Sequence, residues 1–72
     1  MEIGVVGFGY WGKNLVRNFN KLQNCNVKYV CETNNINADN CKETYEKILV
    51  TDNYEKILQD ETVQAIVIAT PV

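Results

Sequence analysis

Three glycines in the stretch IGVVGFGYWGKN restrict this chain more than any other feature of its sequence. They are Gly7, Gly9 and Gly12, and together they form the pattern G-x-G-x-x-G. A short β-branched apolar run precedes them at residues 3–6, and helical spacing follows. At ~7% glycine usage, three fixed glycines arise by chance about once in 3,000 positions, so the pattern alone is weak. Its place between a predicted strand and a predicted helix makes it specific.

The residues after the glycines predict an amphipathic helix of about three turns. Apolar side chains recur at helical spacing at Trp11, Leu15, Phe19 and Leu22, whereas polar residues occupy the other side. Trp11 is the first residue of this stripe, so we expect its ring to pack against the core. The first turn carries Lys13 and no acidic residue, which suits a helix that binds an anion at its N-terminus.

The rest of the chain continues the alternation of strands and helices. We expect a strand at residues 27–31, a helix within residues 34–47, a short strand at residues 49–50, a short helix that runs to Leu58 and a strand at residues 65–69. Asp52 and Glu55 resemble a capping box at the start of the third helix. The last run, AIVIA, is continuously apolar, which is typical of a parallel strand buried on both faces. It ends at Thr70 and Pro71, because proline cannot continue a central strand.

The element order β-α-β-α-β-α-β predicts an α/β fold with a parallel sheet and right-handed crossovers. With a glycine motif after the first strand, it matches a partial Rossmann-type, doubly wound sheet of strand order 3-2-1-4. Ligands bind such sheets where the strand order reverses, outside the carboxyl ends of the strands. We therefore expect the glycine loop and Thr70–Pro71 to line one crevice, although a Thr-Pro pair can also simply end a strand.

Glu32 completes the pattern of a dinucleotide site. It lies twenty residues after Gly12, at the end of the second predicted strand. In such a site Gly7 permits the tight turn out of the strand, Gly9 lets the backbone approach a pyrophosphate, and Gly12 allows close helix packing. The helix N-terminus supplies unpaired N–H groups for the phosphates. A purely structural glycine turn is the alternative.

Glu32 also favours NAD over NADP. Its carboxylate would accept hydrogen bonds from the adenosine ribose and would repel a 2′-phosphate. The next residues, Thr33, Asn34 and Asn35, bring no positive charge to compensate. FAD can use the same glycines and the same acidic residue, so it stays open as a minor alternative.

Composition argues against several other classes of function. The chain has 72 residues, a net charge of −2 and no basic cluster, so nucleic acid and anionic membranes are poor partners. Its longest apolar run is far shorter than the ~20 residues of a membrane span, and no signal peptide is visible, so we expect a cytoplasmic protein. Without histidine or a C-x-x-C pair, we expect no metal site. We expect Cys25, Cys31 and Cys41 to be buried, reduced thiols.

Four segments, IGVVGFGYWGKNLVRNF, VCET, TDNYEKIL and AIVIATPV, resemble the N-terminal part of the glucose–fructose oxidoreductase/inositol dehydrogenase/MocA family. The segment GYWGKNLVRNF is most similar to the branch of nucleotide-sugar 3-dehydrogenases. This resemblance implies an NAD(P)-dependent oxidation of a sugar-ring hydroxyl, often on a UDP-linked amino sugar or sugar acid. The partner is then a sugar or nucleotide sugar, and we also expect a homo-oligomer.

The resemblance extends to the residues expected to contact the cofactor. They are Gly7, Phe8, Gly9, Tyr10, Trp11, Gly12, Glu32, Thr70 and Pro71. It implies that the glycine loop holds the pyrophosphate. It also implies that the Tyr10–Trp11 pair covers the phosphates and the nicotinamide side, and that the Thr-Pro loop touches the cofactor.

Residues 1–72 correspond, by this resemblance, to the N-terminal portion of a dinucleotide-binding domain. Family members continue to a Glu-Lys-Pro segment whose lysine is thought to act in catalysis, and to a mainly β domain that binds the sugar. Neither part is in the sequence, so we expect no catalytic residue in it. Two other interpretations stay open: a non-catalytic module that senses NAD or forms a subunit interface, and an inactive truncated frame. Because the last strand would lie at an open edge, we expect the isolated residues to self-associate.

Overall fold

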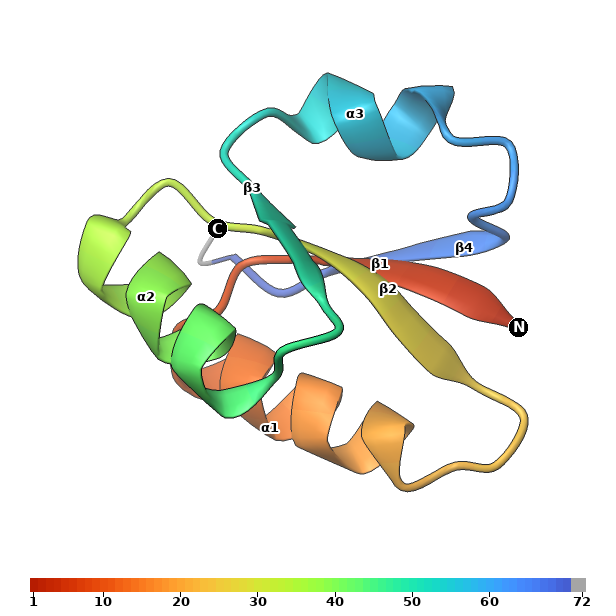
Figure 1. Cartoon of the computed structure of the whole chain (residues 1–72), viewed down its shortest axis with the longest axis horizontal. Coiled ribbons are helices and arrows are strands. Elements are labelled where there is room, and N and C mark those ends of the chain that lie inside the picture. Colours follow the sequence, from red (N-terminus) through yellow and green to blue (C-terminus); the bar gives the residue numbers. More distant parts are fainter. Residues whose placement is uncertain (71–72) are drawn as a thin grey trace.

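A four-stranded parallel sheet organises the computed structural model, which describes residues 1–70 (Figure 1). In chain order the elements are β1 (Glu2–Val6), α1 (Tyr10–Asn20), β2 (Asn26–Cys31), α2 (Asn35–Thr44), β3 (Leu49–Thr51), α3 (Tyr54–Gln59) and β4 (Ala65–Ile68). The strands lie in the order β3-β2-β1-β4, and every pair is parallel. The predicted α/β fold and strand order are therefore confirmed.

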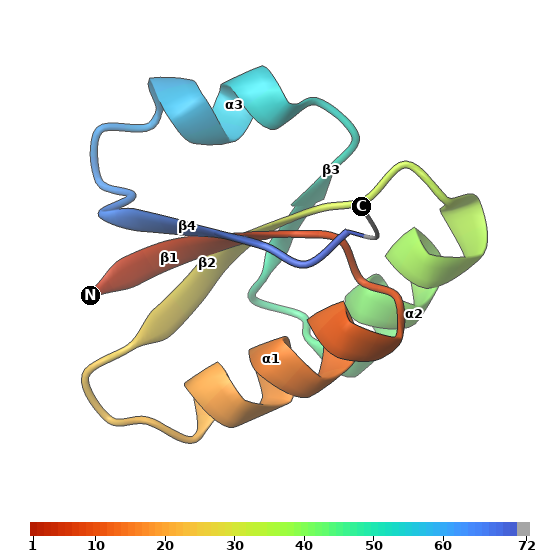
Figure 2. The same ribbon diagram turned by 180° about the vertical axis from the view of Figure 1, so that it is seen from behind.

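The helices divide between the two faces of the sheet. Both views show α1 and α2 on one face and α3 on the other (Figures 1 and 2). The first two crossovers move outward from β1 to β3, whereas α3 carries the chain back across the sheet to β4. The strand order consequently reverses between β1 and β4, and the loops that follow these two strands meet at the same edge.

The main core fills the space between the sheet and the α1–α2 layer. Val5, Val16 and Val30 are fully buried there, together with Cys41. Ile57 of α3, only 1% exposed, fills the opposite face. Each such aliphatic side chain contributes about 1.5–3 kcal/mol by leaving water, so both helical layers are held chiefly by valine and isoleucine packing.

Gly4 has a definite packing role in β1. A Cβ at this position would lie 2.8 Å from Cγ2 of Ile57. The missing side chain therefore lets α3 approach the sheet. The sequence suggested no more than a small residue inside a strand, because the contact partner is 53 residues away in the chain.

A cluster of side chains joins β2, at an irregularity in its pairing with β1, to the α3–β4 loop. The pairing of β1 with β2 skips one residue of β2 between Ile3 and Gly4, and that residue is Lys28. Lys28 Nζ lies 2.7 Å from Asp60 Oδ2, and the hydroxyl of the next residue, Tyr29, donates to the same oxygen over 2.8 Å. Hydrogen bonding, above all from Lys28, holds the pKa of the Asp60 carboxyl well below its ordinary value.

The prediction that Trp11 packs in the core is wrong. Its side chain is 70% exposed, and the buried positions of α1 are Gly12 and Val16. At 3.6 residues per turn, Trp11 lies about 140° around the helix from Val16. The spacing identified the helix correctly, but the buried positions are Gly12 and Val16, each one residue after the predicted Trp11 and Leu15. Leu22 lies beyond the helix end and is 49% exposed.

Two helix ends also differ from their predicted positions. α2 ends at Thr44 rather than near residue 47, because Tyr45 has extended backbone angles at the C-cap. The expected capping box at Asp52 and Glu55 is wrong by one residue. Asn53 is the N-cap of α3, and its side chain accepts the N–H of Glu55 over 3.0 Å. Asparagine and aspartate cap equally well, so the sequence did not distinguish them.

The apolar strand β4 is only partly buried, contrary to the prediction. Ala65, Ile66 and Val67 are partly buried, and Ile68 is 60% exposed. The physical reason is its position: β4 pairs with β1 alone, and the helices pack mainly on the other three strands.

The three cysteines are free thiols, as expected, but only two of them are buried. Cys25 lies in the loop before β2 and is partly exposed, which corrects the prediction for that residue. Burial raises the pKa of the Cys41 thiol to about 11. The pKa of Cys31 is raised too, first by burial and then by the nearby charges of Glu32 and Asp52. Both thiols are thus held protonated at neutral pH.

Candidate functional site

The loop after β1 makes a turn that only glycine accommodates easily. Gly7 has a φ of +104°, in the left-handed region. Its N–H donates to the carbonyl oxygen of Cys31 over 2.8 Å, which fastens the turn to the end of β2. A Cβ on Gly7 would lie 3.1 Å from Cγ2 of Thr70. The predicted tight turn is confirmed, and it places the glycine loop directly against the loop after β4.

Gly12 and Gly9 meet opposite surroundings. A Cβ on Gly12 would overlap the carbonyl oxygen of Gly7 and lie 2.6 Å from its carbonyl carbon. This confirms that Gly12 allows α1 to pack closely. A Cβ on Gly9 would meet no atom within 4 Å. Gly9 therefore leaves open space at the start of the helix, as a ligand-facing glycine would.

The N-terminus of α1 presents free backbone donors. Gly9 is the N-cap, and no side chain caps the helix. The first helical hydrogen bond runs from the N–H of Lys13 to the carbonyl of Gly9, over 2.9 Å. Within residues 1–70, the N–H groups of Tyr10, Trp11 and Gly12 have no carbonyl acceptor in the helix. With no acidic side chain in the first turn, this end of the helix attracts an anion.

Glu32 lies just beyond β2 and contacts two loops at once. Its Oε1 accepts the N–H of Phe8 over 2.7 Å, and its Oε2 accepts the N–H of Asn34 over 2.9 Å. Its own N–H donates to the carbonyl of Thr51 over 2.9 Å. The carboxylate predicted to bind a ribose thus lies beside the glycine loop, where the motif required it.

Three residues of the glycine loop have different surroundings. The ring of Phe8 is 2% exposed and packs edge-to-face against Tyr45 at a centroid distance of 6.3 Å. The rings of Tyr10 and Trp11 are 74% and 70% exposed and contact each other edge-to-face at 5.3 Å. The Phe8 ring is in the core, and the Phe8 N–H donates to Glu32. The predicted contact between Phe8 and a cofactor therefore concerns only the other backbone atoms of Phe8, and it stays a prediction.

A cavity of about 390 Å³ joins these parts at the switch point between β1 and β4. Its lining comprises Gly7, Gly9, Tyr10, Trp11, Glu32, Thr33, Asn37, Ala69 and Thr70. The crevice predicted from the two loops is therefore present, and Thr70 lines it. Pro71, the other residue named for that loop, lies outside the described residues.

Sequence reasoning missed three of the lining residues, which are Thr33, Asn37 and Ala69. Thr33 follows Glu32 in the β2–α2 loop, and Asn37 lies in the first turn of α2, where its N–H donates to the capping side chain of Asn34 over 3.0 Å. No motif spacing marks these positions. The only signal for Thr33 and Asn37 was their nearness to the predicted end of the second strand, and for Ala69 its place directly before Thr70.

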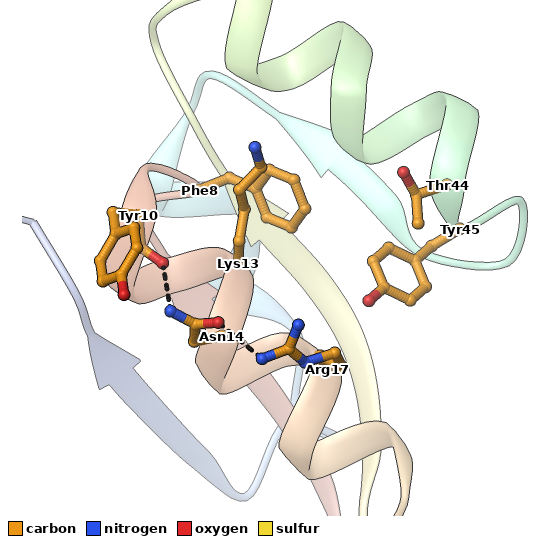
Figure 3. Close-up of a pocket in the computed structure, with 7 residues that line it drawn as sticks. All are labelled: Phe8, Tyr10, Lys13, Asn14, Arg17, Thr44 and Tyr45. Carbon is orange, nitrogen blue, oxygen red and sulfur yellow. Dashed lines mark hydrogen bonds between the residues drawn. The ribbon is translucent and has the colours of Figure 1, made fainter.

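A second groove, of about 400 Å³, lies between α1 and the end of α2 (Figure 3). Lys13 and Arg17, on successive turns of α1, line it together with Phe8 and Tyr45. The Arg17 guanidinium donates to Asn14 Oδ1 over 2.8 Å. This groove shares only Tyr10 with the crevice.

Among residues 1–70, no three His, Cys, Asp or Glu side chains lie together as a metal site would require. No helix there has the length and apolar character needed to cross a membrane.

Comparison with known protein families identifies the chain. A family described as an oxidoreductase family with an NAD-binding Rossmann fold, GFO_IDH_MocA, matches residues 1–72. The chain belongs to this family. The fold described above agrees with the NAD-binding Rossmann fold of that family. No match was found among curated proteins.

Two solved structures have closely similar folds. An NAD-binding protein from Listeria innocua is 27% identical, with a TM-score of 0.85 over 97% of this chain and 20% of its own. An apo scyllo-inositol dehydrogenase from Lactobacillus casei is 24% identical, with a TM-score of 0.83 over 97% of this chain and 21% of its own. The second likeness is one of fold alone. The present chain spans about a fifth of the length of these structures.

Proposed function

We propose that residues 1–72 form the N-terminal portion of the dinucleotide-binding domain of a larger NAD-dependent oxidoreductase. One observation carries the proposal: an uncapped helix N-terminus, an open glycine and an acidic residue after β2 line one cavity. A match over the whole chain to an NAD-binding oxidoreductase family supports it. So does the chain's length, about a fifth of the similar structures.

The residues of the crevice fit a dinucleotide. The free N–H groups at the start of α1 would hold the pyrophosphate, and the open space at Gly9 would admit it without a clash. Trp11 and Tyr10 would cover it from the mouth of the cavity, and Thr70 would contact the nicotinamide half. NAD supplies the hydride-accepting ring, and the chain's own residues bind and orient it.

We propose NAD rather than NADP as the cofactor. Each carboxylate oxygen of Glu32 uses one acceptor position on a backbone N–H, which leaves acceptor capacity for ribose hydroxyls. A 2′-phosphate at the same place would meet the negative charge of Glu32 with no basic residue among its immediate neighbours in sequence.

The choice of NAD over NADP is tested by titrating the natural-length protein with NADH and with NADPH. We expect NADH to bind at least about tenfold more tightly, because one unfavourable charge contact of about 1.4 kcal/mol has that effect. Glu32→Gln should reduce the difference in affinity between NADH and NADPH. Tighter binding of NADPH by the unchanged protein would overturn the assignment.

For the substrate we propose a nucleotide sugar that is oxidised at a ring hydroxyl. The basis is the similarity of GYWGKNLVRNF to nucleotide-sugar 3-dehydrogenases. The test is NADH formation by the natural-length protein with UDP-linked amino sugars, UDP-linked sugar acids, free sugars and inositols. Turnover of free inositols alone would contradict the nucleotide-sugar proposal. NADH binding without turnover would instead support a non-catalytic NAD-sensing module.

A further inference from the structure

Glu32 makes more contacts than reading a ribose requires. We infer that Glu32 is a positioning residue for the glycine loop. It fastens the backbone of that loop to the start of α2 before any dinucleotide binds, and so keeps the α1 N-terminus ready for a pyrophosphate. This inference stands on contacts within the chain, and only its consequence for binding rests on the proposed function.

The contacts connect three segments through one side chain. The backbone N–H of Glu32 is bonded to Thr51 at the end of β3, which fixes the residue to the sheet. From this point its two carboxylate oxygens reach Phe8, in the loop after β1, and Asn34, the N-cap of α2. Hydrogen bonds to an ionised carboxylate are shorter and stronger than those between neutral groups. The 2.7 Å and 2.9 Å distances are in the range of such bonds.

The glycine loop needs a fastening of this kind. Glycine loses more conformational freedom on folding than any other residue, and the loop has glycine at positions 7 and 9. Gly9 has open space around it and no side chain caps α1, so the loop gains little order from its own atoms. Its other anchors are the buried Phe8 ring and the bond from Gly7 to Cys31. Among residues 1–70, the bond from Phe8 to Glu32 is the one that a distant side chain supplies to residues 7–9.

This role and a purely ribose-reading role predict opposite signs for the binding of inorganic pyrophosphate. Pyrophosphate has no ribose, so a ribose reader contributes nothing to it except repulsion between negative charges. Removing Glu32 would then leave pyrophosphate binding unchanged or make it tighter. If Glu32 orders the loop, removing it weakens pyrophosphate binding although a repulsive charge has gone.

Asp52 supplies a matched control. It is an exposed carboxylate that lines the same small cavity beside Glu32. Among residues 1–70 it makes no side-chain hydrogen bond. Asp52→Ala therefore removes an equal charge from a residue of the same small cavity without releasing the loop.

The experiment measures pyrophosphate affinity by calorimetry for the natural-length protein and for Glu32→Ala, Glu32→Gln and Asp52→Ala. We expect Glu32→Ala to bind pyrophosphate at least roughly tenfold more weakly than Asp52→Ala, which is the low end of the loss expected for a hydrogen bond to a charged group. Glu32→Gln keeps a carbonyl acceptor for Phe8 and should fall between Glu32→Ala and the unchanged protein. Equal or tighter binding by both Glu32 variants would overturn the inference.

Amide hydrogen exchange gives a second readout that needs no ligand. The Phe8 amide should exchange at least about tenfold faster in Glu32→Ala than in Asp52→Ala, while amides of β1 keep their rates. Unchanged protection at Phe8 would overturn the inference by itself. Faster exchange at Phe8 in a protein whose unchanged form binds neither pyrophosphate nor NADH would uphold the positioning role and reject the proposed function.

Discussion

Gly9 and Gly12 are the same residue type three positions apart, yet their surroundings predict different roles. Gly9 has an ordinary φ of −78° and open space where a Cβ would lie. At Gly12 the same atom would overlap the backbone of Gly7. Gly9 therefore keeps the cavity free of a side chain, whereas Gly12 lets α1 pack against the turn that precedes it.

We therefore expect Gly9→Ala to change the free energy of unfolding by no more than about 0.5 kcal/mol and to weaken NADH binding strongly. Gly12→Ala should cost about 2–3 kcal/mol of stability, because overpacking forces the backbone apart. Urea unfolding and NADH titration of both variants separate the two effects. A stable Gly12→Ala variant, or a Gly9→Ala variant with unaltered NADH affinity, would contradict this division of roles.

Trp11 offers a direct optical test of the crevice. It is the chain's one tryptophan, it is 70% exposed, and it lines the cavity. We expect NADH to quench its fluorescence, because the reduced nicotinamide absorbs where indole emits. Trp11→Phe should abolish the signal and provides the blank. Unaltered emission from Trp11 while calorimetry shows NADH bound would place the cofactor elsewhere.

At the scale of elements, the cluster around Asp60 joins β2 to the α3–β4 loop. Asp60 accepts from Lys28 and Tyr29, and also from the N–H and hydroxyl of Thr62 over 2.9 Å and 2.6 Å. These bonds lower the pKa of Asp60, with that of Lys28 the largest cause. They also raise the pKa of Lys28 and of Tyr29.

A carboxyl with a lowered pKa stabilises the fold above its ordinary pKa of about 3.9 and loses that contribution as pH falls through the folded-state pKa. The urea midpoint of the unchanged chain should therefore drop between about pH 5 and pH 2. Asp60→Asn should be less stable at pH 6 and should show a shallower acid drop. Asp39→Asn, in the exposed part of α2, serves as control. If the urea midpoints of Asp60→Asn and the unchanged chain depended on pH in the same way, the stabilising role of the Asp60 cluster would be contradicted.

At the scale of the whole molecule, β4 is an edge strand with an apolar surface. It pairs only with β1 in the described structure, and Ile68 is 60% exposed. Exposed apolar edges pair with other chains. Residues 1–72 span about a fifth of the length of the similar structures, and the outer edge of β4 is therefore open to pairing with another chain.

We expect the isolated 72 residues to associate with increasing concentration in sedimentation velocity. Ile68→Lys should reduce the association, because a charge on the edge opposes strand pairing. Ile36→Lys, at a 72% exposed position of α2 away from any strand edge, should have little effect. A monodisperse monomer across the concentration range would refute the prediction.

The general plan of the molecule could be predicted because it follows from local patterns. Glycines at positions 7, 9 and 12, the apolar strands and the acidic residue after the second strand occur in the order that a Rossmann sheet requires. The details that failed depend on neighbours distant in sequence. Helical spacing identified α1 but assigned Trp11 to the wrong face, and the apolar run predicted a strand buried on both faces, whereas β4 is only partly buried.

The sequence by itself thus determined the element order, the parallel sheet and the place of the crevice, because periodicity and glycine spacing act over a few residues. Only the tertiary structure decided how Glu32 bonds to Phe8 and Asn34, why Gly4 must lack a side chain beneath Ile57, and how a bulge brings Lys28 to Asp60. Each of these contacts joins segments that approach only when the sheet and both helical layers pack together. No local pattern contains that information.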